Sequence, residues 1–161
     1  MRHSYQFRPI RSSDEEFLSL LYASTREDEL SVLIDWTDQQ KRDFLSQQFK
    51  AQHTFYQDQF KKAEFLLVLM KKQAIGRLYV DRRKDEIRLI DIALLPAYRG
   101  QGIGRQLMEG VLAEGTKAGK PVRIHVEHNN PAMHLYTRLG FEKIDDTGVY
   151  FLMEWKPEGS F

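Results

Sequence analysis

Residues 90–112 read IDIALLPAYRGQGIGRQLMEGVL, and this stretch decides how the whole chain is interpreted. An apolar run that predicts a strand ends at a proline, and the glycine-rich turn Arg99–Gly104 follows. Ile103, Leu107 and Val111 then recur at the spacing of an amphipathic helix. A strand, a glycine turn and a helix N-terminus together present backbone N–H groups and a positive dipole to an anion. The stretch therefore predicts a site for a phosphorylated ligand.

The spacing of this turn excludes two common phosphate-binding loops. A P-loop requires Lys-Ser or Lys-Thr after its last glycine, and neither follows Gly104. A dinucleotide fingerprint, G-x-G-x-x-G, requires a third glycine where Arg105 stands. The remaining pattern is Arg-x-x-Gly-x-Gly, from Arg99 through Gly102 to Gly104. It resembles the acetyl-CoA pyrophosphate loop of the GNAT superfamily of N-acetyltransferases.

A second motif strengthens this resemblance. Residues 126–141 read VEHNNPAMHLYTRLGF. In GNAT proteins the fifth strand is followed by an Asn, a helix with a Leu-Tyr pair and a closing Leu-Gly-Phe, matched here by Asn130, Leu135-Tyr136 and Leu139–Phe141. The two motifs stand in the family's order and at its usual separation, and the resemblance runs from about Ile75 to Phe141. It implies acetyl-CoA as cosubstrate, and no metal site is expected.

Composition narrows the class of protein. At 161 residues the chain is long enough for one domain, which we expect over residues 1–161. A net charge of +1 gives no field that would select nucleic acid or an anionic membrane. The absence of cysteine excludes disulfides and thiol chemistry. The longest apolar run, residues 65–70, is too short to span a membrane. We therefore expect a cytoplasmic protein with neither nucleic acid nor membrane as a partner.

The periodicity of the rest of the chain predicts an α/β fold: a single GNAT-like domain with a mixed, mostly antiparallel sheet and helices on both faces. Strands are expected at residues 5–9, 64–70, 74–82, 86–95, 121–126, 141–143 and 149–155. Capping-box patterns open the first two helices at Ser13 and Thr37, and residues 26–36 are interpreted as their connector. The third helix should end at Gly119, and the fourth should begin at Asn130 and Pro131.

The resemblance implies how coenzyme A would be held. The backbone of the glycine turn would bind the pyrophosphate, with two arginines adding positive charge: Arg99, Gly100, Gln101, Gly102, Ile103, Gly104 and Arg105. In the family the pantetheine arm pairs with the fourth strand like an added strand. The corresponding backbone positions are Ile92, Ala93 and Leu94. Asn130 would cap the following helix and also contact the coenzyme.

Catalysis needs a proton donor for the leaving thiolate and an acceptor for the amine proton. The resemblance assigns the donor to Tyr136, since a phenol of pKa ~10 can protonate a thiolate whose thiol has a pKa of ~8.5. The base is left open among Asp91, on the fourth strand, and Glu127 and His125, which share one face of the fifth. Arg88 stands where some protein acetyltransferases of the family carry a base glutamate, and many members use a water chain instead.

Two further sets of residues are candidates for a metal site and for the acceptor pocket. His125, Glu127 and His128 lack the helical spacing of a metal motif, and a strand places His128 on the opposite face, so a structural role is expected. The acceptor amine would lie against the first two helices. Aromatic residues would line this pocket and carboxylates would attract the amine, from the set Trp36, His53, Phe55, Tyr56, Glu27, Asp28, Glu29 and Asp35.

These features together predict an acetyl-CoA-dependent N-acetyltransferase. It would move the acetyl group to a primary amine, of a small molecule or a protein, by direct attack in a ternary complex, because no cysteine can carry the acetyl group. The alternatives are a non-catalytic acyl-CoA-binding sensor or scaffold, a different acyl donor, a protein N-terminal acceptor, or a nucleotide-binding domain with the same loop. A homodimer through the late strand Val149–Trp155 is a further possibility.

Overall fold

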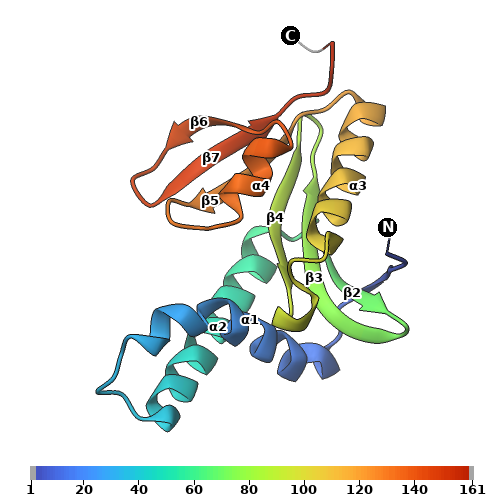
Figure 1. Ribbon diagram of the computed structural model, residues 1–161. Helices are drawn as coiled ribbons and strands as arrows, with labels where there is room; N and C mark the ends of the chain where they lie inside the picture. Colours follow the sequence, from blue (N-terminus) through green and yellow to red (C-terminus); the bar gives the residue numbers. More distant parts are fainter. Residues whose placement is uncertain (1–2, 160–161) are drawn as a thin grey trace. The chain divides into compact units, whose positions relative to one another are not determined.

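A computed structural model describes residues 3–159 and is shown in Figure 1. Along the chain, the elements are β1 (Gln6–Pro9), the 3-10 turn η1 (Ser12–Asp14), α1 (Glu15–Ser31), α2 (Asp38–Gln59), β2 (Glu64–Met70), β3 (Gln73–Arg82), β4 (Ile87–Leu94), the 3-10 turn η2 (Pro96–Tyr98), α3 (Ile103–Ala118), β5 (Val122–Glu127), α4 (Met133–Arg138), β6 (Glu142–Asp146) and β7 (Tyr150–Trp155).

The seven strands form a mixed sheet with the hydrogen-bonding order β1-β2-β3-β4-β5-β7-β6. β4 and β5 pair in parallel, whereas β1–β2, β5–β7 and β6–β7 are antiparallel. The predicted α/β class and mostly antiparallel mixed sheet are confirmed. The residues group into two compact units, one built from Tyr79–Ile92 and from residue 100 onward, the other from Ser4–Leu78 and Ala93–Arg99. The single domain over residues 1–161 stays a prediction.

In the unit that contains the N-terminal half, α1 and α2 pack against β2. Leu18 and Tyr22 from α1, Phe49 from α2 and Leu67 from β2 form its buried cluster. The long helix begins as predicted: Thr37 accepts a hydrogen bond from the Gln40 N–H at 3.0 Å, and the Gln40 side chain accepts one from the Thr37 N–H at 2.8 Å. A reciprocal cap of this kind satisfies two amides that a helix start leaves without partners.

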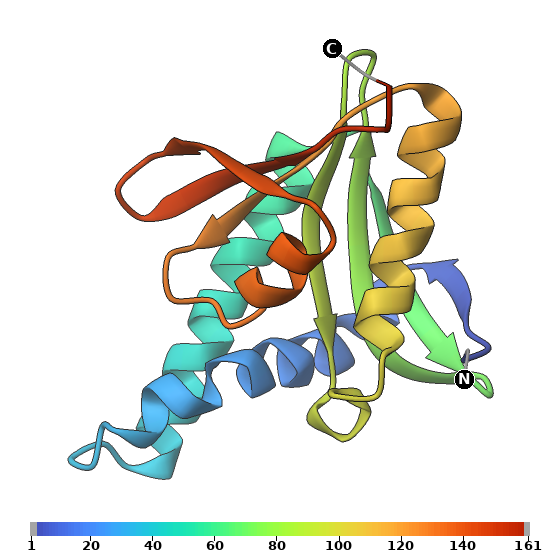
Figure 2. The same cartoon turned by 45° about the horizontal axis from the view of Figure 1, so that its top comes forward.

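In the other unit, alternation along β5 separates two faces. Val122, Ile124 and Val126 are buried, whereas His125 and Glu127 are exposed. The buried face of β5 packs on α3, which contributes Ile103, Leu107, Met108, Val111 and Leu112 to the core. α4 follows β5 in the chain and lies beside the antiparallel pair of β5 and β7, as Figure 2 shows. The strand pattern thus leaves one polar face of this part of the sheet accessible.

The first helix differs from the expectation at both ends. It does not begin at Ser13: Asp14 is engaged by the Arg8 guanidinium at 2.8 and 2.9 Å and by the Arg11 N–H at 2.7 Å, and α1 starts after it. It also continues to Ser31 instead of ending near Arg26. The charged composition of residues 26–31 predicts a connector, but Arg26 pairs with Glu29 at 2.7 Å, and Leu30 is buried. Local pairing and one apolar anchor extend the helix.

Two later boundaries also differ. α4 begins at Met133 and not at Asn130, because the Asn130 side chain accepts the Ala132 N–H at 2.9 Å and builds a separate turn first. β6 extends to Asp146, beyond the predicted end at residue 143, and the turn that follows is closed by the Gly148 N–H donating to the Asp146 carboxylate at 2.8 Å. In both places a side chain of Asn or Asp completes a turn that the apolar pattern cannot show.

The hairpin between β2 and β3 contains backbone strain. Its turn residues Lys71 and Lys72 both have positive φ, 51° and 67°, which is the pattern of a type I′ turn. A lysine in this region costs about 1 kcal/mol or more because its Cβ crowds the backbone. The turn is exposed, so no tertiary contact explains the choice of lysine.

We predict that the double substitution Lys71→Asn and Lys72→Gly stabilises the protein by about 1 kcal/mol, because Asn-Gly adopts the I′ geometry with little strain. Chemical denaturation would report this as a higher midpoint with an unchanged slope. The control is Lys71→Ala with Lys72→Ala, which removes the same charges but keeps both Cβ atoms. An equal gain in the control would assign the effect to charge and contradict the strain argument.

Candidate functional site

The glycine turn before α3 has an unobstructed outer side. Gly100 and Gly102 have φ of 71° and 84°, and a Cβ added at either position would meet no atom within 4 Å. Glycine is therefore required by the backbone conformation and not by packing against the protein. Gly102 is the N-cap of α3, whose first-turn N–H groups have no partners within the helix. The predicted loop and helix start are confirmed, and they leave room for a bulky anion.

The N-terminal segment supports this turn, which the sequence did not reveal. The His3 N–H donates to the Gln106 side chain at 2.8 Å, and the Gln106 amide donates back to the His3 carbonyl at 2.7 Å. The His3 ring lies 2.7 Å from the Gln101 carbonyl oxygen. These partners are about a hundred residues apart, so no local pattern could have indicated them. The contacts hold the turn and the start of α3 in one conformation.

The two arginines proposed for the phosphates lie in different surroundings. Arg99 donates through Nε to the Leu94 carbonyl at 2.9 Å and through Nη2 to the Ser24 hydroxyl at 3.0 Å. Its side chain thus ties the end of β4 to α1. Arg105 is well exposed and pairs with Glu109 along the helix at 3.3 Å. An exposed pair of this kind is weak and exchangeable, so the guanidinium of Arg105 is the more available of the two.

The pairing between β4 and β5 stops midway along both strands. The register covers Ile87–Val122, Arg88–Arg123 and Leu89–Ile124, whereas β4 continues to Leu94 and β5 to Glu127. A strand edge released in this way can accept another extended chain by main-chain hydrogen bonds. The predicted coenzyme contacts Ile92, Ala93 and Leu94 lie on this part of β4.

A glycine on β3 sits directly against the same part of β4. A Cβ at Gly76 would lie 2.3 Å from the Ala93 carbonyl oxygen and 2.8 Å from the Leu94 side chain. Any larger residue would displace the backbone of β4 at the positions predicted to contact the coenzyme. The sequence pattern predicts only a strand at Gly76, although an isolated glycine inside a strand signals a close backbone approach.

Tyr136 is placed on α4 as a buried phenol. It is 4% exposed and packs against Phe141 with ring centroids 5.7 Å apart. Burial raises its pKa well above the usual value for tyrosine, and the carboxylate of Asp91 raises it further. The hydroxyl therefore keeps its proton throughout the physiological range. In the structure, the Asp91 carboxylate is near enough to Tyr136 to raise the pKa of the phenol, so a proton donor and an anion lie near each other.

The other base candidates lie away from this pair. Leu89 and Ile124 face the core. The two candidates on β5, His125 and Glu127, lie on the opposite face of the sheet, which they share with Arg88. Glu127 is exposed at the end of β5, and its carboxylate has no ion pair or hydrogen bond within residues 3–159. Asn130 follows three residues later, also exposed. Asp91 and Glu127 therefore represent two distinct sides from which a proton could be removed.

Histidine and carboxylate positions in the described part of the chain do not gather into a metal centre. No group of three or more His, Cys, Asp or Glu side chains capable of holding an ion occurs there. His128 instead bonds Asp146 at 2.7 Å and stacks on Phe151 with centroids 4.0 Å apart. This is the structural role expected for it from the sequence.

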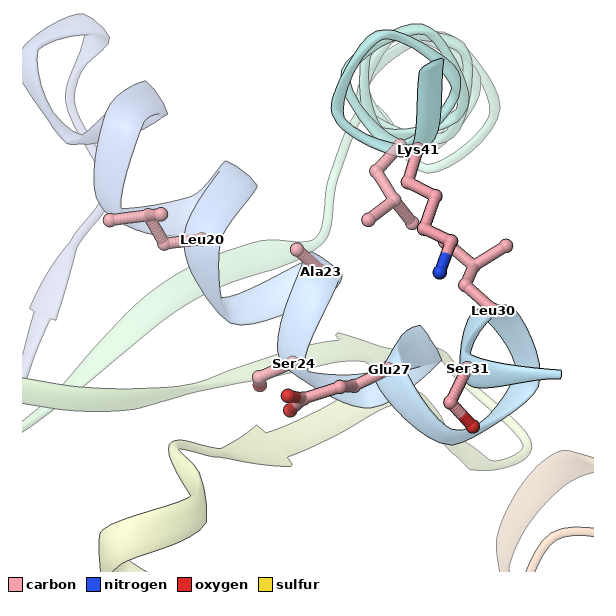
Figure 3. A pocket seen from close by; sticks show the side chains of 8 residues that line it. Leu20, Ala23, Ser24, Glu27, Leu30, Ser31 and Lys41 are labelled. Atoms are coloured by element: carbon pink, nitrogen blue, oxygen red, sulfur yellow. The ribbon is translucent and has the colours of Figure 1, made fainter. Parts of the chain in front are cut away.

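An open pocket of about 490 Å³ lies between α1 and α2. Figure 3 shows the Lys41 side chain extending from α2 toward α1, the helix that carries Glu27. The pocket is lined by Leu20, Ala23, Ser24, Glu27, Leu30, Ser31, Lys41 and Leu45. Of the residues proposed for an acceptor pocket, only Glu27 lines it. Trp36 packs on Phe44, and His53 stacks on Phe49.

A sequence model described as the acetyltransferase (GNAT) family matches residues 26–141, which is most of the chain and contains both motifs. The chain belongs to the GNAT acetyltransferase family. One curated relative, the [ribosomal protein bS18]-alanine N-acetyltransferase of Haemophilus influenzae, is 30% identical over 95 residues, or 58% of this chain. The aligned region spans 63% of the length of that relative.

Solved structures share the fold. The PaiA N-acetyltransferase of Thermoplasma acidophilum, crystallised with coenzyme A, has a TM-score of 0.71 at 19% identity, covering 95% of this chain and 99% of its own. PH1933 of Pyrococcus horikoshii has a TM-score of 0.69 at 19% identity, with 96% and 99% covered. The ribosomal-protein-S18-alanine N-acetyltransferase of Escherichia coli has a TM-score of 0.59 at 18% identity, with 98% and 99% covered. In the described residues, no helix has both the length and the apolar character to cross a membrane.

Gly104 offers a test of the loop, because it lies in the first turn of α3, where protein stability alone would favour alanine. We predict that Gly104→Ala raises the free energy of unfolding of the unliganded protein by about 0.5–1 kcal/mol. The same change should weaken acetyl-CoA binding at least about tenfold, since its methyl group would stand where the anion approaches.

Gly110 is the matched control, an exposed glycine later in the same helix. Gly110→Ala should stabilise the protein similarly and leave acetyl-CoA affinity unchanged. Calorimetric titration and chemical denaturation of both variants check the pair. Unchanged affinity in Gly104→Ala would remove this glycine from the ligand site.

Proposed function

We propose that this protein transfers the acetyl group of acetyl-CoA to a primary amine by direct attack in a ternary complex. Two observations support the proposal: the open outer side of the glycine turn at the start of α3, and the part of β4 that continues beyond its registered pairing with β5. A pyrophosphate fits the first feature and an extended amide arm fits the second. A cofactor with both parts is an acyl-CoA.

Each residue has a proposed role in this reaction. Gly100–Gly104 and the exposed Arg105 hold the pyrophosphate, while Ile92, Ala93 and Leu94 receive the pantetheine arm. The amine lone pair attacks the thioester carbonyl, so that the C–N bond forms and the C–S bond breaks. Tyr136 donates its proton to the departing thiolate, and a carboxylate on either side, Asp91 or Glu127, takes the proton from the amine. Solvent exchange then restores both groups.

The raised pKa of Tyr136 bears on this role. The phenol of the unliganded protein is fully protonated at neutral pH, which a donor requires. Its acidity is low, so the proton moves only as negative charge develops on the sulfur. A non-catalytic acyl-CoA sensor is the second candidate. The same glycine loop favours it, but a sensor has no use for a protonated phenol at Tyr136.

We predict that acetyl-CoA at about a hundredfold its dissociation constant adds roughly 2.7 kcal/mol to stability, because it binds only the folded protein. Thermal unfolding should show a shift of several degrees with acetyl-CoA and with coenzyme A. ATP is the control, since it offers phosphates without a pantetheine arm. A larger shift with ATP than with acetyl-CoA would favour a nucleotide-binding domain and overturn the proposal.

A second prediction separates enzyme from sensor. Tyr136→Phe removes only the hydroxyl, so it should lower kcat by about a hundredfold, within the range of general acid catalysis. Acetyl-CoA affinity should stay within about twofold, because the ring and its packing remain. Release of free thiol, followed with an amine panel, measures turnover. Unchanged turnover would show that another group protonates the thiolate, and no turnover in the native protein with any amine would favour the sensor.

A further inference from the structure

The exposed face of β5 begins where its pairing with β4 ends. His125 is the first residue of β5 beyond the last registered pair, Leu89–Ile124, and Glu127 follows on the same face. On the neighbouring strand β7, Leu152 stands opposite His125, and Tyr150 stands opposite Glu127. Under the proposed function, this is the face from which an acceptor reaches the thioester, because Tyr136 occupies the other side.

The contacts of His125 fix which ring nitrogen carries its proton. The Arg88 Nη1 lies 3.3 Å from Nδ1, and a guanidinium can only donate, so Nδ1 accepts. In the neutral imidazole the proton then resides on Nε2. His125 therefore presents an N–H donor to the exposed face.

The surroundings of His125 favour this neutral form. Burial and the charge of Arg88 lower its pKa, and the carboxylates of Glu86 and Asp145 act in the opposite direction. Glu86 is itself buried and paired with Arg88 at 3.2 Å, and the Tyr150 ring lies 6.3 Å from the imidazole. Protonation is thus suppressed near neutral pH, where the ring is a neutral hydrogen-bond donor.

Glu127, two residues further along β5, supplies a hydrogen-bond acceptor, in contrast to the N–H donor of His125. Its carboxylate is exposed and has no ion pair or hydrogen bond within residues 3–159. The strand rise places it about 6.6 Å along β5 from His125. Tyr150, 41% exposed, lies directly across from it and offers an aromatic surface. The face therefore carries one acceptor of a cation, one N–H donor and one apolar patch.

We propose that this face recognises an α-amino carbonyl group, the free N-terminus of a peptide, as the acetyl acceptor; this rests on the proposed function. Glu127 binds the terminal amine, the Nε2–H of His125 donates to the first carbonyl oxygen, and the first side chain packs on Tyr150 and Leu152. Arg88 is a positioning residue, since it acts only by fixing the tautomer of His125. As the C–N bond forms and the thiolate leaves with the proton of Tyr136, Glu127 takes the proton of the amine.

Acid–base chemistry distinguishes this acceptor from a lysine side chain or a polyamine. An α-amino group has a pKa near 7.8 and is about one-seventh neutral at pH 7, whereas an alkylamine with a pKa near 10.4 is neutral in about one molecule in 2,500. An exposed carboxylate is a weak base and cannot easily offset that difference. A second ammonium would also meet the donor face of His125 and the cation of Arg88, which repel it.

The experiment compares three acceptors with the full-length protein. They are a peptide with a free α-amine and no lysine, the same peptide with a blocked N-terminus and one lysine, and 1,4-diaminobutane. The free α-amine should give a kcat/KM at least about tenfold higher than the others, in line with its neutral fraction. Comparable or higher values for the lysine peptide or the diamine would overturn the proposal.

Variants of His125 test the donor directly. His125→Leu should raise KM for the α-amino peptide by about five- to tenfold, as for loss of one hydrogen bond, and leave KM for the diamine nearly unchanged. His125→Gln keeps an N–H donor and should restore most of the peptide KM. A merely structural role would instead affect both amines equally and would not distinguish Gln from Leu, and that result would contradict the assignment.

Nitrogen NMR of the imidazole gives a readout that does not depend on turnover. The signals lost in His125→Leu identify the residue, and they should show the Nε2–H tautomer at pH 7 in the native protein. Arg88→Met should release that preference and raise the pKa of His125. An Nδ1–H ring in the native protein would contradict the model of recognition. An acetyl-CoA thermal shift with turnover of any amine would keep the proposed function standing, so the two failures are distinct.

Discussion

The early end of the β4–β5 pairing is the constraint on which the proposed site depends. After Leu89 and Ile124, the two parallel strands share no further registered pair, although each continues for several residues. Parallel neighbours inside a sheet normally satisfy each other along their length, so the interruption leaves main-chain groups for a ligand. The buried pairs before it hold the strands together, and the polar faces beyond it carry the candidate chemistry. A regular ladder at this point would close the coenzyme's proposed path.

The charged side chains near the end of the β4–β5 pairing form ion pairs with one another. Arg88 and Arg123 both contact Glu86, and Arg123 also binds Glu154 at 2.7 Å. Removing one member of such a partly buried network would leave an unpaired charge. The network thus fixes Arg88 in place, and Arg88 in turn contacts His125. The positive charge of Arg88 beside the imidazole opposes its protonation. The ion-pair network therefore influences the protonation state of His125 on the proposed acceptor face.

The parts of the structure that were predicted from the sequence are those encoded locally. The glycine turn, α3 with its stop at Gly119, and the cap of α2 each follow from residues within a few positions of one another. The interpretation of residues 26–31 as a connector was wrong, because one ion pair and one buried leucine continue α1 to Ser31 despite the charged composition. His3 against the loop could not be predicted, since the contact joins segments about a hundred residues apart.

The candidate catalytic residues illustrate a different limit. Periodicity placed His125 and Glu127 on one face of a strand, and the structure agrees, but only the contact with Arg88 reveals that the histidine is a donor. A donor cannot take the proton of the amine, so the carboxylate of Glu127 becomes the acceptor on that face and His125 becomes a recognition group. From the sequence, the shared strand face of His125 and Glu127 left the choice of base open. With the contact of Arg88 known, the two residues receive separate roles. The weakness of an exposed carboxylate as a base then favours an amine that is already partly neutral, and among biological amines this favours the α-amino group.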